Sequence, residues 1–524
     1  MRPPSPLIVD PARRRLLLAG AGLCGLALGG AVAPRAQAYR EARTPFTLGI
    51  ASGQPEPDGF VIWTRLAPEP YAPGGGLSAP SIAVAWEVAA DAAFTRVLQR
   101  GVESAEPAWG YSLHVEVVGL SPGRPYWYRF RAGDFRSAVG RALTAPVIGA
   151  PLASLRVATV SCQHYEQGYF SAYRHLVADD PELVLHLGDY IYETPTDRPV
   201  RLHEAAEPRT LEQYRARYAC YKQDADLQRA HAHCAWLMVA DDHEVDNDYA
   251  GALSQDDESP ETFLVRRAAA YQAYWEHQPL RLAARPRGGG MPLYGSYRFG
   301  DLLQLSLLDG RQYRDNQACE LPQRRGGRVI EGACLERLQP QRSLLGAAQE
   351  AWLGRQLVRR GARWNVIAQQ TLLASLDQDP GPGVAYWSDG WDGYPAARRR
   401  LLQQIVDSRV SNPLVLSGDV HSFWATELRL DPLDSRAPPV ASEFVGTSIS
   451  SEGLLHDHFA RMLPQNPHIR FFDARARGYL MSRIDAQTWR TELRAMDTVT
   501  QPQSTVRTLA AFVVEAGRPG FQTA

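Results

Sequence analysis

The chain has 524 residues, of which 45% are hydrophobic and 22% are charged. These proportions are typical of globular proteins and exclude disordered, collagen-like and coiled-coil chains, and the length predicts two or more domains. The formal net charge of -1 gives no basic field that would indicate binding to nucleic acid.

The first 38 residues have the pattern of an export signal. Three arginines, 13 to 15, precede an apolar stretch that runs to about Ala33, and Ala36-Gln37-Ala38 is a small-x-small cleavage site. Paired arginines before such a stretch are typical of the twin-arginine route. We expect residues 1–38 to be a signal peptide, the twin-arginine export machinery to be a partner, and the mature protein to be secreted or periplasmic. The alternative, a membrane anchor, is disfavoured because the stretch is short and rich in Gly and Ala.

Residues 39–150 are predicted to form a separate β-sandwich domain. Residues 59–65 and 82–88 alternate with period two, which is typical of strands, and Gly74-Gly75-Gly76 marks a loop. Residues 120–129 resemble the turn and strand of fibronectin type III domains, in which a tyrosine pins the preceding corner. We therefore expect an all-β domain of fibronectin or immunoglobulin type, with a packing role and no chemistry.

From residue 151 the pattern changes to strands rich in Val and Leu that alternate with helical stretches. The predicted strands are residues 155–160, 183–189, 236–243, 302–309, 364–369 and 413–419, and two of the predicted helices are residues 211–218 and 349–359. This alternation indicates an α/β layered domain, which we expect over residues 151–524.

Four of these strands end in side chains that are common metal ligands: Cys162, Asp189, Asp242-His243 and Asp419-x-His421. A single aspartate at a strand end is more often a cap than a ligand. Ligands of α/β sheets bind at the carboxyl ends of the strands, so four such endings in one domain predict a metal centre at that edge.

Together these residues resemble a known family. Cys162, Gly188-Asp189-x-x-Tyr192-Glu193, Asp242-His243-Glu244 and Gly418-Asp419-Val420-His421 resemble the calcineurin-like metallophosphatases, and more closely the PhoD-like alkaline phosphatases and phosphodiesterases. The resemblance extends to residues 161–163, 168–170, 392–395, 446–450 and 512–517, and so covers nearly the whole mature chain. It implies a layered metallophosphatase β-sandwich core flanked by helices, preceded by the all-β domain.

The resemblance also implies the cofactors, Fe³⁺ and Ca²⁺. Cys162 thiolate and Tyr192 phenolate are the ligands expected for Fe³⁺, because a phenolate is an anionic, hard ligand. Asp189 is expected to bridge the metals, since one carboxylate can give an oxygen to each of two ions. Asp242 stands where other metallophosphatases carry asparagine, and its added charge suits Ca²⁺.

Further site residues follow from spacing and from the same resemblance. Asp419 and His421 are two residues apart, so in an extended strand end both side chains share a face and can reach the metals. Asn247 offers a further ligand oxygen. His243 is expected to donate a proton to the leaving oxygen or to stabilise phosphate oxygens. Tyr190 stands where some relatives carry an arginine near the phosphate, and is expected to contact the substrate.

His164 forms Cys162-x-His164, which echoes an Asp-x-His ligand pair of the wider superfamily. PhoD-like proteins do not depend on a histidine at this position, so His164 is not expected to be a ligand.

The expected function is that of a secreted, metal-dependent phosphoric ester hydrolase, an alkaline phosphatase of PhoD type. A metal-bound hydroxide would attack phosphorus in line, with Asp189 and His243 as the catalytic residues. The serine-nucleophile alternative would need a Gly-x-Ser-x-Gly elbow, which the sequence lacks. Two alternatives stay open: a phosphodiesterase or phospholipase D on the same fold, for which a phospholipid would be a substrate, and a non-catalytic surface binding protein. We expect a monomer.

Six cysteines are present, and the export signal contains one of them, Cys24. With Cys162 as a ligand, four remain, and four cysteines allow three pairings. Cys220 and Cys234 bracket one short segment, and Cys319 and Cys334 bracket another. We predict these two local disulfides, which are compatible with an oxidising destination.

Overall fold

The computed structural model describes residues 36–256, 258–321, 325–434 and 436–524. The predicted signal peptide, residues 1–38, lies outside these ranges except for its last three residues. Of those, Gln37–Ala38 form a short strand, β1, which pairs in parallel with β4 (Ile82–Ala89). The export signal and its cleavage site therefore stay predictions.

The largest sheet has ten strands, in the order β25-β24-β23-β22-β10-β11-β12-β2-β3-β6. Its centre is parallel and consists of β10 (Ser154–Val160), β11 (Leu183–His186) and β12 (Ala235–Met238). Antiparallel strands extend it on the β10 side: β22 (Arg477–Asp485), β23 (Thr488–Met496), β24 (Val506–Glu515) and β25 (Gln522–Thr523).

Strands from the N-terminal region complete this sheet on the β12 side. They are β2 (Ile50–Glu56), which runs parallel to β12, and then β3 (Gly59–Arg65) and β6 (Ser112–Val118), both antiparallel. The ladder is continuous across residue 150, and residues 37–524 form one compact unit. The boundary between two domains near residue 150 stays a prediction.

The N-terminal region is rich in β-structure, as expected. A six-stranded sheet contains β1, β4, β5 (Val97–Ala105), β7 (Pro125–Ala132), β8 (Phe135–Arg136) and β9 (Gly140–Leu143). Its apolar side chains pack with those of β2, β3 and β6 in one core cluster, which makes a sandwich. The predicted tyrosine corner is present, because the Tyr126 hydroxyl donates to the Ser121 carbonyl at 2.9 Å.

The second sheet has seven strands, in the order β13-β14-β16-β18-β20-β19-β21. Four are parallel: β14 (Leu303–Leu307), β16 (Trp364–Ala368), β18 (Pro413–Ser417) and β20 (Ala441–Val445). The antiparallel edges are β13 (Gly295–Phe299), β19 (Phe423–Leu428) and β21 (Ile469–Asp473), and a separate ribbon pairs β15 (Val329–Glu331) with β17 (Ala385–Trp387).

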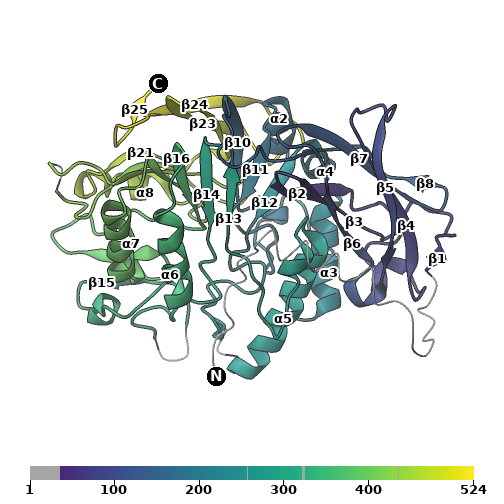
Figure 1. Ribbon diagram of the computed structural model, residues 1–524. Helices are drawn as coiled ribbons and strands as arrows, with labels where there is room; N and C mark the ends of the chain where they lie inside the picture. The colour runs from purple at the N-terminus through teal and green to yellow at the C-terminus, as the bar shows by residue number, and fades with distance from the viewer. Residues whose placement is uncertain (1–35, 257, 322–324, 435) are drawn as a thin grey trace, which may run out of the picture. The chain divides into compact units, whose positions relative to one another are not determined.

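Alternation along the strands shows how the layers stack. In β16, Val366 and Ala368 pack in the same cluster as β10, β11 and β12, whereas Ile367 packs with the opposite cluster. That opposite cluster includes α6 (Gly346–Leu357) and α7 (Pro395–Asp407), which lie below β16 and to the left of β14 in Figure 1. The two sheets therefore face each other, and the expected layered core flanked by helices is confirmed.

The helices beside the ten-stranded sheet pack in the same apolar cluster as β10, β11 and β12. Of these helices, α3 and α4 lie to the right of β12 in Figure 1. The helices are α2 (Ala172–Ala178), α3 (Leu211–Lys222), α4 (Ala225–His233) and α5 (Pro260–His277), and a short helix, α8 (His456–Ala460), follows later. A capping box begins α3: Thr210 Oγ1 accepts from the Gln213 N–H at 3.4 Å, and Gln213 Oε1 accepts from the Thr210 N–H at 3.0 Å. In the part of the chain that the structure describes, no helix is both long and apolar enough to cross a membrane.

One of the two predicted disulfides is confirmed and one is wrong. Cys319 and Cys334 are bonded, with an S–S distance of 2.06 Å. Cys220 and Cys234 are both buried free thiols. The reason is the helix between them: α4 alone has nine residues, a length of about 13 Å, and disulfides need Cα atoms within about 7 Å.

Candidate metal centre

The predicted site residues lie in loops that follow the parallel strands of both sheets. Cys162 comes two residues after β10, Asp189 three after β11, and Asp242 four after β12, while Asp419 follows β18 in the opposite sheet. Cys162, Asp189 and Asp419 have φ angles of 57°, 56° and 64°. Such left-handed conformations cost about 1–3 kcal/mol each, and they cluster where function requires them.

Two glycines let these loops approach one another closely. A Cβ on Gly188, whose φ is +110°, would lie 2.4 Å from the Asp241 Cβ. A Cβ on Gly418 would lie 2.4 Å from the Ser161 Oγ. The first contact joins the loops after β11 and β12, and the second joins the loops after β10 and β18, so the two sheets meet at the site.

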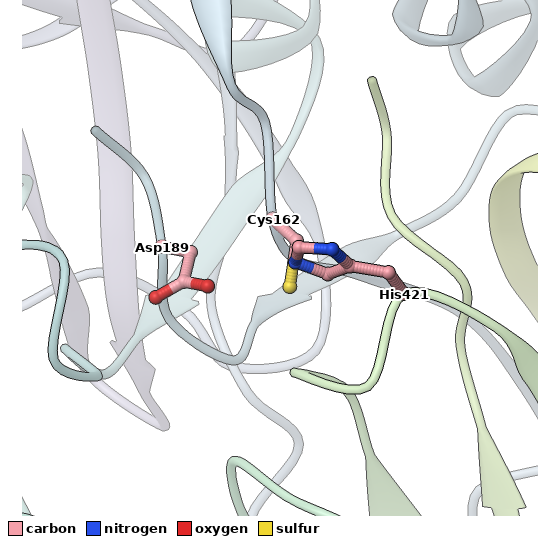
Figure 2. Close-up of side chains that lie close together, drawn as sticks. All are labelled: Cys162, Asp189 and His421. Atoms are coloured by element: carbon pink, nitrogen blue, oxygen red, sulfur yellow. The ribbon is translucent and has the colours of Figure 1, made fainter. Parts of the chain in front are cut away.

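Asp189 lies at the centre of the candidate ligands. Three groups of possible ligand atoms contain it, and within each group the atoms lie within 4.8 Å of one another. The groups are Cys162 with Asp189 and His421, Asp189 with Asp242 and His243, and Asp189 with Asp241 and Asp419. Figure 2 shows the first group, in which three separate segments bring their side chains together. A carboxylate shared in this way is suited to bridge two cations.

The burial of the carboxylates fits bound cations. Asp189 Oδ1 and Asp241 Oδ2 are buried and have no hydrogen-bond partner among the described residues. Burial, with the nearby Asp242 and Asp241 carboxylates, holds the pKa of Asp189 well above its usual range. An unpaired buried carboxylate is costly, and a metal ion would compensate both its charge and its free oxygen.

The Tyr192 hydroxyl lies between the central aspartate and the seven-stranded sheet. It donates to Asp189 Oδ2 at 2.9 Å, accepts from Ser451 Oγ at 2.9 Å, and lies 3.0 Å from His421 Nε2. The other nitrogen of His421, Nδ1, is 2.7 Å from the Glu452 carbonyl, which fixes the orientation of the ring. The structure therefore brings Tyr192 and His421 to the same side of Asp189 as Cys162.

His243 is held by a buried glutamate. Its Nδ1 is 2.8 Å from Glu193 Oε2, and the other carboxylate oxygen of Glu193 accepts from the Asn247 N–H at 2.8 Å. Burial lowers the pKa of His243, but the Glu193, Asp189 and Asp242 carboxylates outweigh it and hold the pKa well above its usual range. Glu193 holds Nδ1, so Nε2 is the ring nitrogen that this carboxylate leaves available.

Sequence reasoning missed Arg311, a buried cation among the carboxylates. Its Nε lies 2.5 Å from Asp241 Oδ1, its Nη2 3.3 Å from Asp242 Oδ2, and its Nη1 2.9 Å from Asp389 Oδ2. The guanidinium therefore orients two adjacent aspartates at the end of β12. Its position in the sequence could have indicated a role, because Arg311 lies two residues after the predicted strand 302–309, at the carboxyl end where ligands of α/β sheets bind.

Glu244 was also missed as a structural clamp. Its Oε2 accepts from the Asp189 N–H at 3.1 Å and from the Asp241 N–H at 2.8 Å, and its Oε1 accepts from the Tyr190 N–H at 2.6 Å. One carboxylate thus fixes the backbone of two site loops. Its place in the Asp242-His243-Glu244 motif was the signal that could have identified it.

The predicted substrate contact of Tyr190 is wrong. Its side chain is fully buried, its hydroxyl lies 2.8 Å from His231 Nε2, and its ring packs against His186 and Tyr218. The physical reason is local: Glu244 binds the Tyr190 N–H, and the aromatic ring fills the space beside α3 and α4, in the core.

Asn247 and His164 lie near the site without an observed ligand role. Asn247 Nδ2 donates to Gln255 Oε1 at 2.8 Å, and its role as a metal ligand stays a prediction. His164 Nδ1 accepts from the Glu166 N–H at 3.2 Å, so this nitrogen is engaged within the protein.

Comparison with known proteins identifies the family of the chain. Residues 157–493 match the family model of the PhoD-like phosphatases, and residues 31–146 match the model of the N-terminal domain of PhoD-like phosphatases. Alkaline phosphatase D from Bacillus subtilis (strain 168) is 41% identical over an alignment of 525 positions, which covers 97% of this chain and 88% of the relative. A solved structure of PhoD is similar with a TM-score of 0.89 and 41% identity, over 93% of each chain.

Proposed function

This chain belongs to the PhoD-like phosphatase family, and on that premise we propose that it is an exported alkaline phosphatase that hydrolyses phosphoric monoesters. The observation that supports this most strongly is the sharing of Asp189 by three groups of candidate ligands, with one of its buried oxygens left without a partner. Membership of this family implies that the activity depends on metal ions.

The donor atoms around Asp189 divide into two sets that suit different metals. Cys162, Tyr192 and His421 offer a thiolate, a phenolate and an imidazole, which suit Fe³⁺. Asp242 and Asp419 offer only carboxylate oxygens, which suit Ca²⁺, and Asn247 would add an amide oxygen. Bound there, the metals would polarise the phosphoryl group and activate water.

His243 is the proton donor in this proposal. Glu193 holds Nδ1 at 2.8 Å, which leaves Nε2 to deliver a proton to the leaving oxygen of the ester. The Glu193, Asp189 and Asp242 carboxylates raise the pKa of His243, which favours the protonated ring that an acid requires. Arg311 holds Asp241 and Asp242 in place but does not itself need to touch the substrate.

A direct comparison of substrates tests the proposal. Purified protein would be assayed with p-nitrophenyl phosphate, bis-p-nitrophenyl phosphate and phosphatidylcholine. We expect the monoester to be hydrolysed fastest, and Asp189→Asn to remove the activity, which would assign it to this site. Hydrolysis confined to the diesters would reject a monoesterase and favour a phosphodiesterase or phospholipase D.

A further inference from the structure

A buried arginine of α3, Arg217, binds the segment that carries Tyr192 and Glu193. Only 3% of Arg217 is exposed. Its Nη1 donates to the carbonyls of Tyr192 and Glu193, the latter at 2.7 Å. Its Nη2 donates to the carbonyls of Ala205 and Ala206, each at 2.9 Å. One guanidinium thus joins the residues just after the Asp189 loop to the segment that leads into α3.

The same helix binds the other polar group of the Tyr192 backbone. Tyr221 lies four residues after Arg217, so the two side chains share one face of α3. The Tyr221 hydroxyl accepts from the Tyr192 N–H at 3.0 Å. Both the N–H and the C=O of Tyr192 are therefore held by side chains of α3, and the backbone at this position has little freedom.

Tyr192 and Glu193, whose carbonyls Arg217 binds, contact two different groups of the proposed active site. Tyr192 reaches Asp189 Oδ2 through its hydroxyl at 2.9 Å, and Glu193 reaches His243 Nδ1 at 2.8 Å. A displacement of this peptide would therefore move a candidate metal ligand and the partner of the proton donor together.

An arginine is required for this arrangement because of its shape. A buried charge is costly unless several dipoles compensate it, and here four carbonyl oxygens do so. The planar guanidinium can direct two nitrogens to two pairs of acceptors, whereas a lysine has one nitrogen at the end of a flexible chain.

We propose that Arg217 is a positioning residue for the phosphatase reaction, which fixes the backbone from which Tyr192 reaches the metal site and Glu193 orients His243. The inference rests on the proposed role of His243 as proton donor and extends it. Arg217 touches neither substrate nor metal, and it acts through the carbonyls of these two residues.

The test is Arg217→Lys, with Arg215→Lys as the matched control. Arg215 is on the same helix and equally buried, but it pairs with Glu276 at 2.5 Å, away from the site. Steady-state rates would be measured with p-nitrophenyl phosphate and with an alkyl phosphate, whose leaving group needs a proton. We expect Arg217→Lys to lower kcat by about 10- to 100-fold, more for the alkyl ester, with little change in KM. We expect Arg215→Lys to change kcat by less than about threefold for both.

Two further variants keep the test decisive. Tyr221→Phe removes the hydroxyl that accepts from the Tyr192 N–H at 3.0 Å and from the Tyr165 N–H at 3.1 Å, and that lies 3.1 Å from His203 Nε2. We expect it to show the same pattern as Arg217→Lys with a smaller loss of kcat, and it replaces Arg217→Lys as the test if that variant does not fold. His243→Asn removes the proposed acid, and it shows how far kcat then falls for each of the two leaving groups. If His243→Asn lowers kcat equally for p-nitrophenyl phosphate and for the alkyl phosphate, His243 is not the proton donor. The role of Arg217 is then tested only by the difference in kcat between Arg217→Lys and Arg215→Lys. A kcat for Arg217→Lys equal to that of Arg215→Lys, or a normal kcat for Tyr221→Phe, would overturn the inference.

Discussion

At the scale of single residues, the loops of the site depend on the carboxylate of Glu244. Glu244 is fully buried, and burial raises its pKa to about 7. Its two oxygens accept from three backbone N–H groups, including those of Asp189 and Asp241. The positions of these two aspartates are therefore set by one residue of the loop after β12, the loop that also carries Asp241.

We expect Glu244→Gln to weaken both stability and catalysis. A glutamine offers one acceptor oxygen, and its amide hydrogens would face an N–H group. The free energy of unfolding should fall by about 1–3 kcal/mol, measured by urea denaturation. The displaced aspartates should lower kcat by about 10- to 100-fold.

Glu443→Gln is the matched control for this variant. Glu443 is equally buried and accepts from the Leu373 and Ala374 N–H groups at 2.7 and 2.9 Å. Its replacement should lower stability to a similar extent and leave kcat within about twofold. If Glu244→Gln loses stability but keeps the kcat of Glu443→Gln, the clamp has no role in positioning the site.

The sequence showed which residue types lie at the site, but it showed less well in which direction each side chain points. Ligand types at strand ends identified Cys162, Asp189 and Asp419, because those positions meet at one edge in any layered α/β domain. Tyr190 was misplaced because adjacent residues in an irregular loop have no fixed alternation, so its ring could point either way. Arg311 was missed because a buried arginine is recognised only once the carboxylates around it are known.

At the scale of the elements, the site exists because two strand ends touch. Gly418 directly follows β18 and packs on Ser161, which directly follows β10. Gly446 directly follows β20 in the same sheet, and a Cβ there would meet Leu480 Cγ at an ordinary 3.5 Å. The two glycines occupy similar positions but have different amounts of space.

We expect Gly418→Ala to separate the two loops. The new Cβ would lie 2.4 Å from Ser161 Oγ, so the free energy of unfolding should fall by about 1–3 kcal/mol. Activity should fall as well, because Asp419 is the next residue. Thermal denaturation and kcat, compared with Gly446→Ala as the tolerated control, measure both effects. Equal behaviour of the two variants would show that the loops do not need this close approach.

Predictions at this scale succeeded where they depended on local pattern. Apolar runs located β10, β16 and β18 to within a few residues, and the helical stretches predicted at residues 211–218 and 349–359 overlap α3 and α6. Period-two alternation also identified β3, but it could not show that β2 pairs with β12 in the catalytic sheet. Strand partners depend on tertiary contacts, which a local pattern does not determine. The incorrect Cys220–Cys234 disulfide has a local cause instead, because helix α4 separates the two cysteines.

At the scale of the whole molecule, the N-terminal strands and the site share one sheet. The ladder runs from β6 through β3 and β2 to β12, and the loop after β12 carries Asp242 and His243. The N-terminal region therefore supports the edge strand of the parallel core. The family resemblance predicted both regions because it covers nearly the whole mature chain, whereas the continuity of the sheet became clear only from the pairing.

We propose above that two different metals, Fe³⁺ and Ca²⁺, bind around Asp189. The most direct measurement is elemental analysis of protein purified without chelators, with its visible spectrum recorded beside that of Tyr192→Phe. We expect iron together with calcium, and a coloured charge-transfer band from thiolate and phenolate ligands that changes in the variant. A colourless active protein that contains only zinc would contradict the assignment of iron to Cys162 and Tyr192.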